Sequence, residues 1–561
     1  MNRSPNSVVR QRAAAAWLSL LALASACLAV PLRRPEAPVP VAGENIYRKG
    51  VLSTGEPLRG ARAAGIEIAG PAAACANCHR RSGLGEVEGR ALVPPVTAKY
   101  LYRARGSRRP TDLQNAALTM AEPGARPELL RQAERPAYSD ATLARAIREG
   151  IGPDGRAFGY LMPRFSIGDA DMASLIAYLK QLSRRPSPGV GEETLQFATI
   201  ITPDADPTKR KGMLDVLEHF FGKQNVFDEG QGPPAQLSQR FTPIAHRWQL
   251  HVWRLTGGPE SWETQLDELL KREPVFAAIS GIGGETWEPV HRFCQRSGLP
   301  CLFPNVDLPP DEEQDFYDVY FSKGVLLEAE LIAGRLRSLD TKVSPRRLVQ
   351  IYRRGDIGEA AAASLRHATA NIETVDRAIE PEAGPAKLRQ ALSDVGPDDG
   401  LVLWLRPGDI ETLPQPPAAR AVFVSGIMSG LEHAPLAGAW REVARMTYPF
   451  DLPQARAVRM DYPLGWMHFK QIPVVDERVQ TDTWLACLAV SETVSMIGED
   501  LVRDHLLETL EMHLGTRVVN GYFPRLGLAA GQRFASKGGF LVRFASPQGA
   551  TLAADGDWNV P

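Results

Sequence analysis

One pentapeptide constrains this chain more than any other feature of its sequence: Cys75-Ala76-Asn77-Cys78-His79. Two thiols three residues apart can form thioethers to the two vinyl groups of one porphyrin, and the imidazole that follows is then held beneath the iron. We therefore interpret the pentapeptide as the attachment site of one covalently bound haem c. Cys75 and Cys78 are the predicted thioether residues, and His79 is a predicted axial ligand of the haem iron.

Two other uses of closely spaced cysteines fit the sequence less well. A zinc site would require a further pair of thiolate or imidazole ligands nearby, and no other cysteine lies between residues 28 and 293. A redox-active Cys-x-x-Cys pair would have no use for the histidine that follows it. The sequence therefore favours haem attachment.

An electron-transfer haem needs a second axial ligand, for which we predict Met162. This residue lies in the turn Gly159–Arg164, before a predicted helix over residues 169–182, where a loop can present sulfur to the iron. Met120 and Met172 are the alternatives, although Met172 occupies an apolar helical position that is typical of a core. Filling both axial positions predicts one-electron transfer, whereas a haem enzyme with an open site is the alternative if Met162 is not a ligand.

The strings CANCH, LMPRF and DMASLIAYLKQL together resemble class I cytochrome c. The resemblance implies a small all-α cytochrome c domain, which we assign to residues 40–183. It also implies a proline whose carbonyl accepts the NH of the haem histidine, here Pro94 or Pro95. The first helix of the family would correspond to residues 44–50 or to the stretch after them. Amphipathic periodicity separately predicts a helix over residues 140–149.

The N-terminal residues have the pattern of an export signal. Three arginines precede an apolar run from Ala13 to Val30, and Ala24-Ser25-Ala26 supplies the small residues that cleavage requires. We therefore predict a signal peptide or an N-terminal anchor over residues 1–35 and a periplasmic location, with inner-membrane attachment only if the segment is not cleaved. Cys27 as the lipid-bearing cysteine of a lipoprotein is a weaker alternative.

After a Pro- and Gly-rich linker at residues 184–194, the sequence changes character. Short apolar runs such as LQFATIIT, RLVQIYR and GLVLWL alternate with helical stretches, which predicts α/β architecture with largely parallel sheets. Residues 195–561 are numerous enough for two lobes. Lys and Arg number 64 and Asp and Glu number 65, so net charge does not indicate a nucleic-acid partner.

The segments beginning LQFATIITPDAD and PVFAAISGIGGE resemble type 1 periplasmic binding proteins, in particular the receptors for branched-chain and other amino acids. The resemblance implies a two-lobed α/β domain with a ligand between the lobes. Six residues after predicted strands are its cleft candidates: Gly283, Gly284, Glu285, Thr286, Asn305 and Asp307. The glycines could equally serve only a tight turn, and Glu285 would repel a carboxylate. Asp356 is either a further cleft residue or a helix N-cap.

The sequence leaves one cysteine pair open and assigns the tryptophans to cores. Cys294 and Cys301 flank a predicted helix-to-strand turn, where a disulfide and two reduced thiols are equally compatible with the sequence. For Trp287, Trp404, Trp466 and Trp484, packing in a core is favoured over stacking on a ligand.

These observations define a leading hypothesis and an alternative. The leading one is a periplasmic electron-transfer protein, not an enzyme, whose C-terminal domain either docks a redox partner or couples a small ligand to electron flow. A periplasmic quinoprotein dehydrogenase or a terminal oxidase is the partner class we expect. The alternative is a receptor for a small amino acid or carboxylate, in which the haem reports the redox state.

Overall fold

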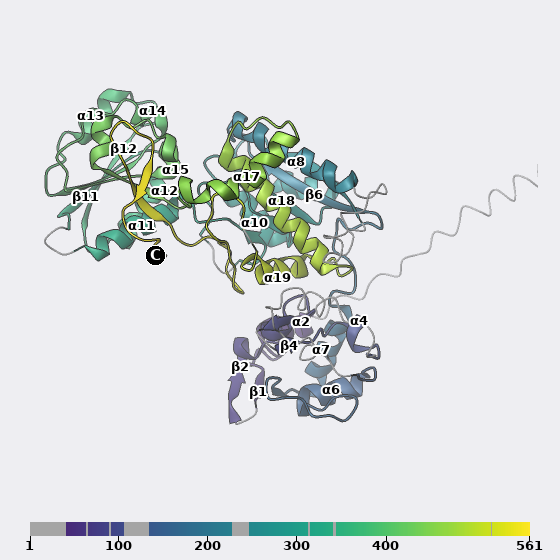
Figure 1. Cartoon of the computed structure of the whole chain (residues 1–561). Coiled ribbons are helices and arrows are strands. Elements are labelled where there is room, and N and C mark those ends of the chain that lie inside the picture. Colours follow the sequence, from purple (N-terminus) through teal and green to yellow (C-terminus); the bar gives the residue numbers. More distant parts are fainter. Residues whose placement is uncertain are drawn as a thin grey trace, which may run out of the picture.

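The computed structural model describes residues 41–62, 65–88, 91–105, 134–226, 246–311, 315–339, 344–517 and 519–561. The predicted signal segment, Cys27 and Met120 lie outside these ranges. Within them, no helix combines the length and the apolar character needed to cross a membrane. Figure 1 shows a small helical domain beside a larger region made of two α/β lobes.

Helices dominate the small N-terminal domain: α2 (Val41–Lys49), η2 (Gly70–Ala73), α3 (Ala76–His79), α4 (Ala98–Leu101), α6 (Asp140–Glu149) and α7 (Asp169–Gln181). The helices predicted over residues 140–149 and 169–182 are therefore confirmed. Short strands accompany them, which the all-α expectation did not include. They form an antiparallel sheet of β2 (Glu67–Ala69), β1 (Arg59–Ala61) and β5 (Arg164–Ser166), and a pair of β3 (Glu86–Glu88) and β4 (Ala91–Val93).

The boundaries of α6 follow from its flanking residues. The Ser139 hydroxyl accepts a hydrogen bond from the backbone NH of Thr142, and the Thr142 hydroxyl accepts one from the backbone NH of Ser139. Gly150 ends the helix with φ of 69°, a left-handed conformation that favours glycine. Between these ends, α6 buries Leu143 and Ile147 in the domain core.

A close helix crossing organises this core. A Cβ atom at Gly43 of α2 would lie 2.2 Å from the carbonyl oxygen of Ser174 in α7, so only glycine permits this approach. Tyr47 and Tyr178 pack beside the crossing with ring centroids 5.5 Å apart. The first turn of the predicted haem motif packs on the same cluster through Cys75.

The first lobe of the C-terminal region, here called lobe I, has a five-stranded parallel sheet in the order β10-β9-β8-β6-β7. Its strands are β6 (Thr194–Ile201), β7 (Arg247–Arg254), β8 (Ala277–Ile279), β9 (Cys301–Leu302) and β10 (Asp318–Val319). Its helices are α8 (Pro207–Val226), η4 (Pro259–Ser261), α9 (Trp262–Arg272), α10 (Glu288–Ser297), α17 (Pro453–Phe469), α18 (Glu477–Ile497) and α19 (Arg503–Leu514).

Lobe II has a seven-stranded sheet in the order β12-β11-β13-β14-β15-β16-β17, parallel except for its last two pairings. Its strands are β11 (Arg347–Arg353), β12 (Glu373–Ile379), β13 (Asp399–Trp404), β14 (Ala421–Val424), β15 (Ala444–Tyr448), β16 (Phe540–Phe544) and β17 (Leu552–Ala554). Its helices are α11 (Val325–Ser338), α12 (Ile357–Ala368), α13 (Pro385–Leu392), α14 (Pro407–Ile410), α15 (Gly426–Ser429), η5 (Leu431–His433) and α16 (Gly438–Val443). The predicted α/β architecture with largely parallel sheets is confirmed.

In the described part of the chain, the backbone crosses between the lobes after β10, after β15 and after α19. Each crossing contributes one buried phenylalanine to a shared cluster, namely Phe321, Phe450 and Phe523. The ring centroid of Phe523 lies 5.2 Å from that of Phe321 and 5.4 Å from that of Phe450. This aromatic cluster forms an apolar base where the two lobes meet.

The predicted linker at residues 184–194 is held against lobe I. The Ser187 backbone NH donates to the Leu501 carbonyl over 3.0 Å, and the Ser187 hydroxyl accepts from the Arg503 backbone NH over 2.9 Å. The Arg503 guanidinium in turn donates to the carbonyl of Phe276, the residue before the central strand β8 of the lobe I sheet. These bonds attach the small domain to lobe I close to the start of α19.

The two questions about cysteines and tryptophans have clear structural answers. Cys294 and Cys301 form a disulfide, with their Cα atoms 6.3 Å apart. The assignment of tryptophans to cores is confirmed for Trp287, Trp404 and Trp484, each at most 3% exposed. Trp466 packs against Phe220, with ring centroids 6.3 Å apart.

Candidate functional site

The predicted haem-attachment residues lie on one short helical turn. Cys75 and Cys78 are partly exposed and are not joined in a disulfide, and His79 is 8% exposed. The Nδ1 atom of His79 lies 2.9 Å from the carbonyl oxygen of Pro94, so of the two candidate prolines it is Pro94 whose carbonyl faces the ring. An Nδ1–H that donates to this carbonyl leaves Nε2 as the lone-pair nitrogen available to a metal.

Burial favours the neutral form of this histidine. Desolvation lowers the pKa of His79 below its ordinary value, against the smaller opposing effect of the Pro94 carbonyl. A neutral imidazole is the form that binds iron, because a protonated ring has no lone pair to donate. Burial and the Pro94 contact therefore both suit the predicted role of His79 as an axial ligand.

Met162 lies in a loop that one arginine holds in place. The Arg164 guanidinium donates to the carbonyl of Met162 over 2.6 Å and to that of Phe158 over 3.1 Å. Met162 is partly buried against the domain core, while its neighbours Tyr160 and Leu161 are 70% and 50% exposed. The competing Met172 is 3% exposed in the core, as its helical position predicts.

These residues fit a covalently bound haem. The thiols of Cys75 and Cys78 would provide two attachment points, the His79 imidazole would provide one axial nitrogen, and Met162 would provide a thioether from a loop of its own. When bound, haem with both axial positions filled supplies a one-electron redox couple. The chain would contribute the ligands, the apolar surroundings and the contact surface for a partner.

The cytochrome-like domain docks on an acidic face of α19. Asp500, Asp504, Glu508 and Glu511 recur at intervals of four, four and three residues, so they line one side of this helix and the turn before it. Figure 1 shows α19 directly beside the small domain. Opposite these carboxylates stand basic and hydroxyl side chains of the small domain: Arg48, Arg80, Arg81, Ser82, Lys99 and Tyr100.

The centre of this interface is buried. Glu508 is 5% exposed and accepts hydrogen bonds from the backbone NH of Ser82, over 3.0 Å, and from the Ser82 hydroxyl. Burial raises the pKa of Glu508 to about 8, although Arg80 favours the ionised form. Glu511 is also 5% exposed and forms an ion pair with Arg80, the residue that follows the predicted haem ligand His79.

Polar contacts continue from this interface into lobe I. Glu511 also pairs with Arg533 over 2.6 Å, and the Arg533 guanidinium donates to the Asp315 carbonyl over 2.7 Å. The Asp315 carboxylate lies 2.6 Å from His291 Nε2, and His291 Nδ1 lies 2.9 Å from the Tyr320 hydroxyl. The contacts therefore form a continuous chain from the haem motif to Tyr320.

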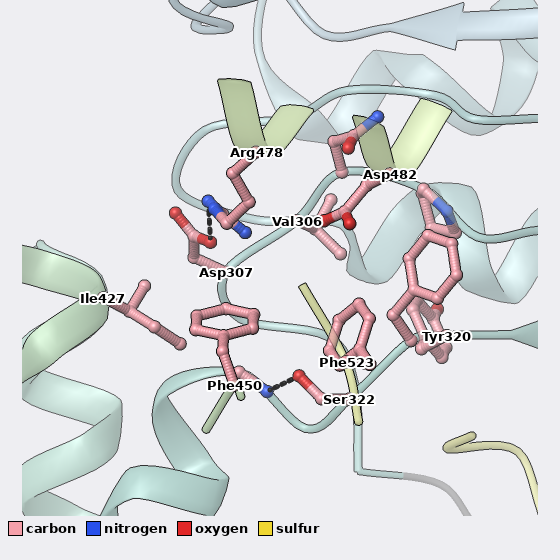
Figure 2. A pocket seen from close by; sticks show the side chains of 13 residues that line it. Val306, Asp307, Tyr320, Ser322, Ile427, Phe450, Arg478, Asp482 and Phe523 are labelled. Atoms are coloured by element: carbon pink, nitrogen blue, oxygen red, sulfur yellow. Dashed lines mark hydrogen bonds and ion pairs between the residues drawn. The ribbon is translucent and has the colours of Figure 1, made fainter. Parts of the chain in front are cut away.

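Tyr320 lines a cavity between the lobes, here called the inner cavity. Figure 2 shows its wall, with Asp482 and Arg478 of α18 above the rings of Phe450 and Phe523. Its volume is about 20 Å³, room for a group about the size of a water molecule. Arg478 donates to Asp307 over 2.8 Å, and both side chains are largely buried.

A wider hollow of about 510 Å³, here called the outer hollow, adjoins the inner cavity through shared residues. Both lobes line it, so it lies in the cleft between them. Charged side chains on its wall include Asp204, Lys209, Glu285, Asp307, Arg353, Arg354, Asp356, Arg406 and Arg478. The combined space is of the size that holds small-molecule ligands.

The structure brings together five of the six predicted cleft residues. Gly283, Gly284, Glu285, Asn305 and Asp307 line the outer hollow. Thr286 is not among the lining residues, and its hydroxyl accepts a hydrogen bond from the Glu288 backbone NH at the start of α10. Asp356 serves both suggested roles, because it caps α12 and also lines the hollow, where it pairs with Arg406.

Sequence reasoning missed the residues that α18 and the crossings contribute. Arg478 and Asp482 lie one helical turn apart, and nothing in their sequence distinguishes them from the solvated face of a helix. Phe450 and Phe523 belong to the crossings, which the sequence pattern does not place next to each other.

Comparisons with known proteins found separate similarities for the two parts of the chain. Residues 63–183 match the family model of cytochrome c, so the N-terminal domain is a cytochrome c domain. A search of curated proteins found no match. The C-terminal α/β region, with one parallel and one mixed sheet, is similar in fold to two-lobed periplasmic binding proteins.

Three solved structures illustrate the second likeness. A fatty acid ABC transporter substrate-binding protein from Thermomonospora curvata is 12% identical, with a TM-score of 0.45 over 67% of this chain and 95% of that one. A substrate-binding periplasmic protein from Ralstonia solanacearum is 13% identical, with a TM-score of 0.46 over 64% and 100%. A substrate-binding protein of an ABC transporter from Aeropyrum pernix is 12% identical, with a TM-score of 0.48 over 66% and 97%.

Proposed function

We propose that this protein is a periplasmic c-type cytochrome that transfers one electron at a time through a single haem ligated by His79 and Met162. We further propose that its C-terminal domain binds a small ligand and that this binding is coupled to the haem. The first part is supported by the adjacent thiols of Cys75 and Cys78 on one helical turn and by the orientation of the His79 ring. The second part is supported by Asn305, Asp307 and Arg478, which line both the inner cavity and the outer hollow.

Each part of the chain has a defined task in this function. The Pro94 carbonyl fixes the tautomer and orientation of His79, and Arg164 fixes the loop that carries Met162. Tyr160 and Leu161 offer exposed apolar surface beside that loop, which suits the docking of a redox partner protein. A periplasmic quinoprotein dehydrogenase or a terminal oxidase is the partner class that we propose.

The observation that carries the coupling is the continuous chain of polar contacts between the two domains. It begins at Arg80, next to the haem ligand, passes through the buried carboxylate of Glu511, and ends at Tyr320 on the wall of the inner cavity. Buried ion pairs hold a fixed geometry because separating them leaves an uncompensated charge. A change at the cavity can therefore alter the charge distribution beside the haem.

A second candidate function is favoured by the cleft itself. Residues of both lobes line the outer hollow, an arrangement that suits a ligand receptor. In that case ligand binding would be the primary activity and the haem would report the redox state. The two functions differ in whether the haem exchanges electrons with a partner protein during turnover.

The coupling can be tested by measuring the haem reduction potential in the full haem-loaded chain. Glu511→Gln removes a negative charge beside Arg80. Because the oxidised haem is more positive than the reduced haem, losing this negative charge destabilises the oxidised form, so we expect the reduction potential to rise. Glu263→Gln is the matched control, because Glu263 makes its ion pairs with Arg292 and Arg296 within lobe I. Equal potentials for Glu511→Gln and the wild type, with native circular dichroism, would refute the coupling.

A further inference from the structure

Two oxygen atoms of residues that line the inner cavity have no hydrogen-bond partner among the described residues. They are Oδ1 of Asp482 and Oδ1 of Asn305, and both are buried. Asp482 is 3% exposed and points toward the centre of the view in Figure 2. A buried oxygen acceptor without a donor is destabilising, so both atoms call for a group that donates hydrogen bonds.

The amide of Asn305 is held in its orientation by its surroundings. Its Nδ2 atom donates to the hydroxyl of Ser280 over 2.9 Å and to that of Thr483 over 3.2 Å. Nδ2 also donates to the carbonyl of Gly281 over 3.4 Å, and because a carbonyl can only accept, this contact favours the amide orientation with its NH2 group on this side. In that orientation the Oδ1 atom is the buried acceptor that has no donor.

The charge of the inner cavity also favours a cation. Its charged lining residues are Asp307, Arg478 and Asp482. Arg478 and Asp307 neutralise each other over 2.8 Å, which leaves the carboxylate of Asp482 without a counter-ion of its own. Burial raises the pKa of Asp482 to about 7, against the opposing effect of Arg478, which is the behaviour of a buried carboxyl that lacks sufficient positive charge.

The size of the inner cavity and the residues around it further restrict which chemical group could occupy it. The inner cavity admits a group about the size of a water molecule, which is the size of an ammonium group. The aromatic rings of Phe450, Phe523 and Tyr320 line the same space, and the face of an aromatic ring attracts a cation. The Arg478 guanidinium already lies over the ring of Phe450, with 5.8 Å to its centroid. The rest of a ligand would extend into the outer hollow.

The turn at Gly283, Gly284 and Glu285 could bind a ligand carboxylate, but a carboxylate of the chain already occupies it. Asp204 Oδ2 accepts a hydrogen bond from the Glu285 backbone NH over 2.7 Å. A Cβ atom at Gly284 would lie 2.5 Å from the same oxygen, so the carboxylate sits directly on the turn. Glu285 adds a second negative charge there, and a ligand carboxylate would meet repulsion at this position.

We propose that the cleft binds a primary amine that carries no carboxylate, with its ammonium group in the inner cavity against Asp482 and Asn305 and its body in the outer hollow. The inference deepens the ligand-binding part of the proposed function and rests on it. It differs from the expectation of an amino acid or carboxylate ligand, because the filled turn removes the place for the carboxylate.

Titration calorimetry of the full haem-loaded protein tests the proposal with three small probes. Ethanolamine carries an ammonium group and no carboxylate. Ethylene glycol has a neutral hydroxyl in place of the ammonium group, and glycine carries both an ammonium group and a carboxylate. We expect ethanolamine to bind at least tenfold more tightly than either of the others. Glycine or ethylene glycol binding as tightly as ethanolamine would overturn the amine inference but leave a ligand-binding cleft intact.

A pair of variants locates the binding. Asp482→Asn keeps the size of the side chain and removes its charge, so we expect ethanolamine affinity to fall at least tenfold. Asp461→Asn is the matched control on the exposed surface of α17 and should bind like the wild type. Unchanged ethanolamine affinity in Asp482→Asn, or no detectable binding of ethanolamine to the wild type, would overturn the inference. The proposed coupling between the cleft and the haem is tested separately, by the haem reduction potential of Glu511→Gln.

Discussion

Glu508 predicts a measurable pH dependence of stability. In the folded chain, burial between the domains raises the pKa of this carboxyl to about 8, whereas an unfolded chain has a glutamate pKa of about 4.3. Between these values the folded state holds a proton that the unfolded state has released, so stability falls as pH rises and levels off above the folded pKa. From pH 6 to pH 8, this one group lowers the free energy of unfolding by about 2 kcal/mol.

Glu508→Gln tests this number, because the amide keeps the shape of the side chain and cannot titrate. Burial also raises the pKa of Glu328 and of Asp482 to about 7, but both groups remain in the variant, so the difference between the two pH slopes isolates Glu508. Glu499→Gln, at an exposed position before α19, is the control for loss of one charge.

Denaturant titrations at pH 6 and pH 8 provide the assay. Residues 41–183 contain no tryptophan, so tryptophan fluorescence reports the C-terminal domain while haem absorbance reports the cytochrome domain. We expect Glu508→Gln to have the shallower pH slope and Glu499→Gln to have the slope of the wild type. Equal slopes in Glu508→Gln and the wild type would refute the assignment of a neutral carboxyl to this interface.

Two further predictions concern the haem and the disulfide. Met162→Ala should lower the haem reduction potential and open one iron position, which carbon monoxide binding to the reduced protein would detect; wild-type behaviour would exclude Met162 as a ligand. Replacing Cys294 and Cys301 by alanine should lower the free energy of unfolding by about 2.5 kcal/mol, as loop closure predicts for a sequence separation of 7. Denaturant unfolding under non-reducing conditions measures this loss, and an unchanged midpoint and slope would contradict it.

The sequence predicted those parts of the structure that depend on local pattern. The thiols and imidazole of residues 75–79 are specified by spacing alone, and the helices over residues 140–149 and 169–182 by apolar periodicity. Buried parallel strands such as those at residues 195–202 are apolar on both faces, which made the α/β region recognisable. The resemblance to periplasmic binding proteins suggested the turn at Gly283 and Gly284 as a cleft residue set, and both glycines line the outer hollow.

Contacts between distant segments could not be predicted in this way. Arg80 meets Glu511, and Asp482 lines the same cavity as Phe523, only because the chain crosses between the lobes and returns. For an acidic residue on a helix, the sequence pattern alone predicts solvent exposure, and only the three-dimensional structure shows whether other segments cover it. The interface at α19 and the inner cavity therefore emerged only from the structure.

The most direct test of the central claim is the absorption spectrum of the reduced wild-type protein, purified with its haem, before and after addition of carbon monoxide. A haem with both axial positions occupied by His79 and Met162 has no free position, so we predict a six-coordinate c-type spectrum that carbon monoxide leaves unchanged. A spectrum that shifts on addition of carbon monoxide, or the absence of covalently bound haem, would contradict the assignment of this protein as an electron-transfer cytochrome.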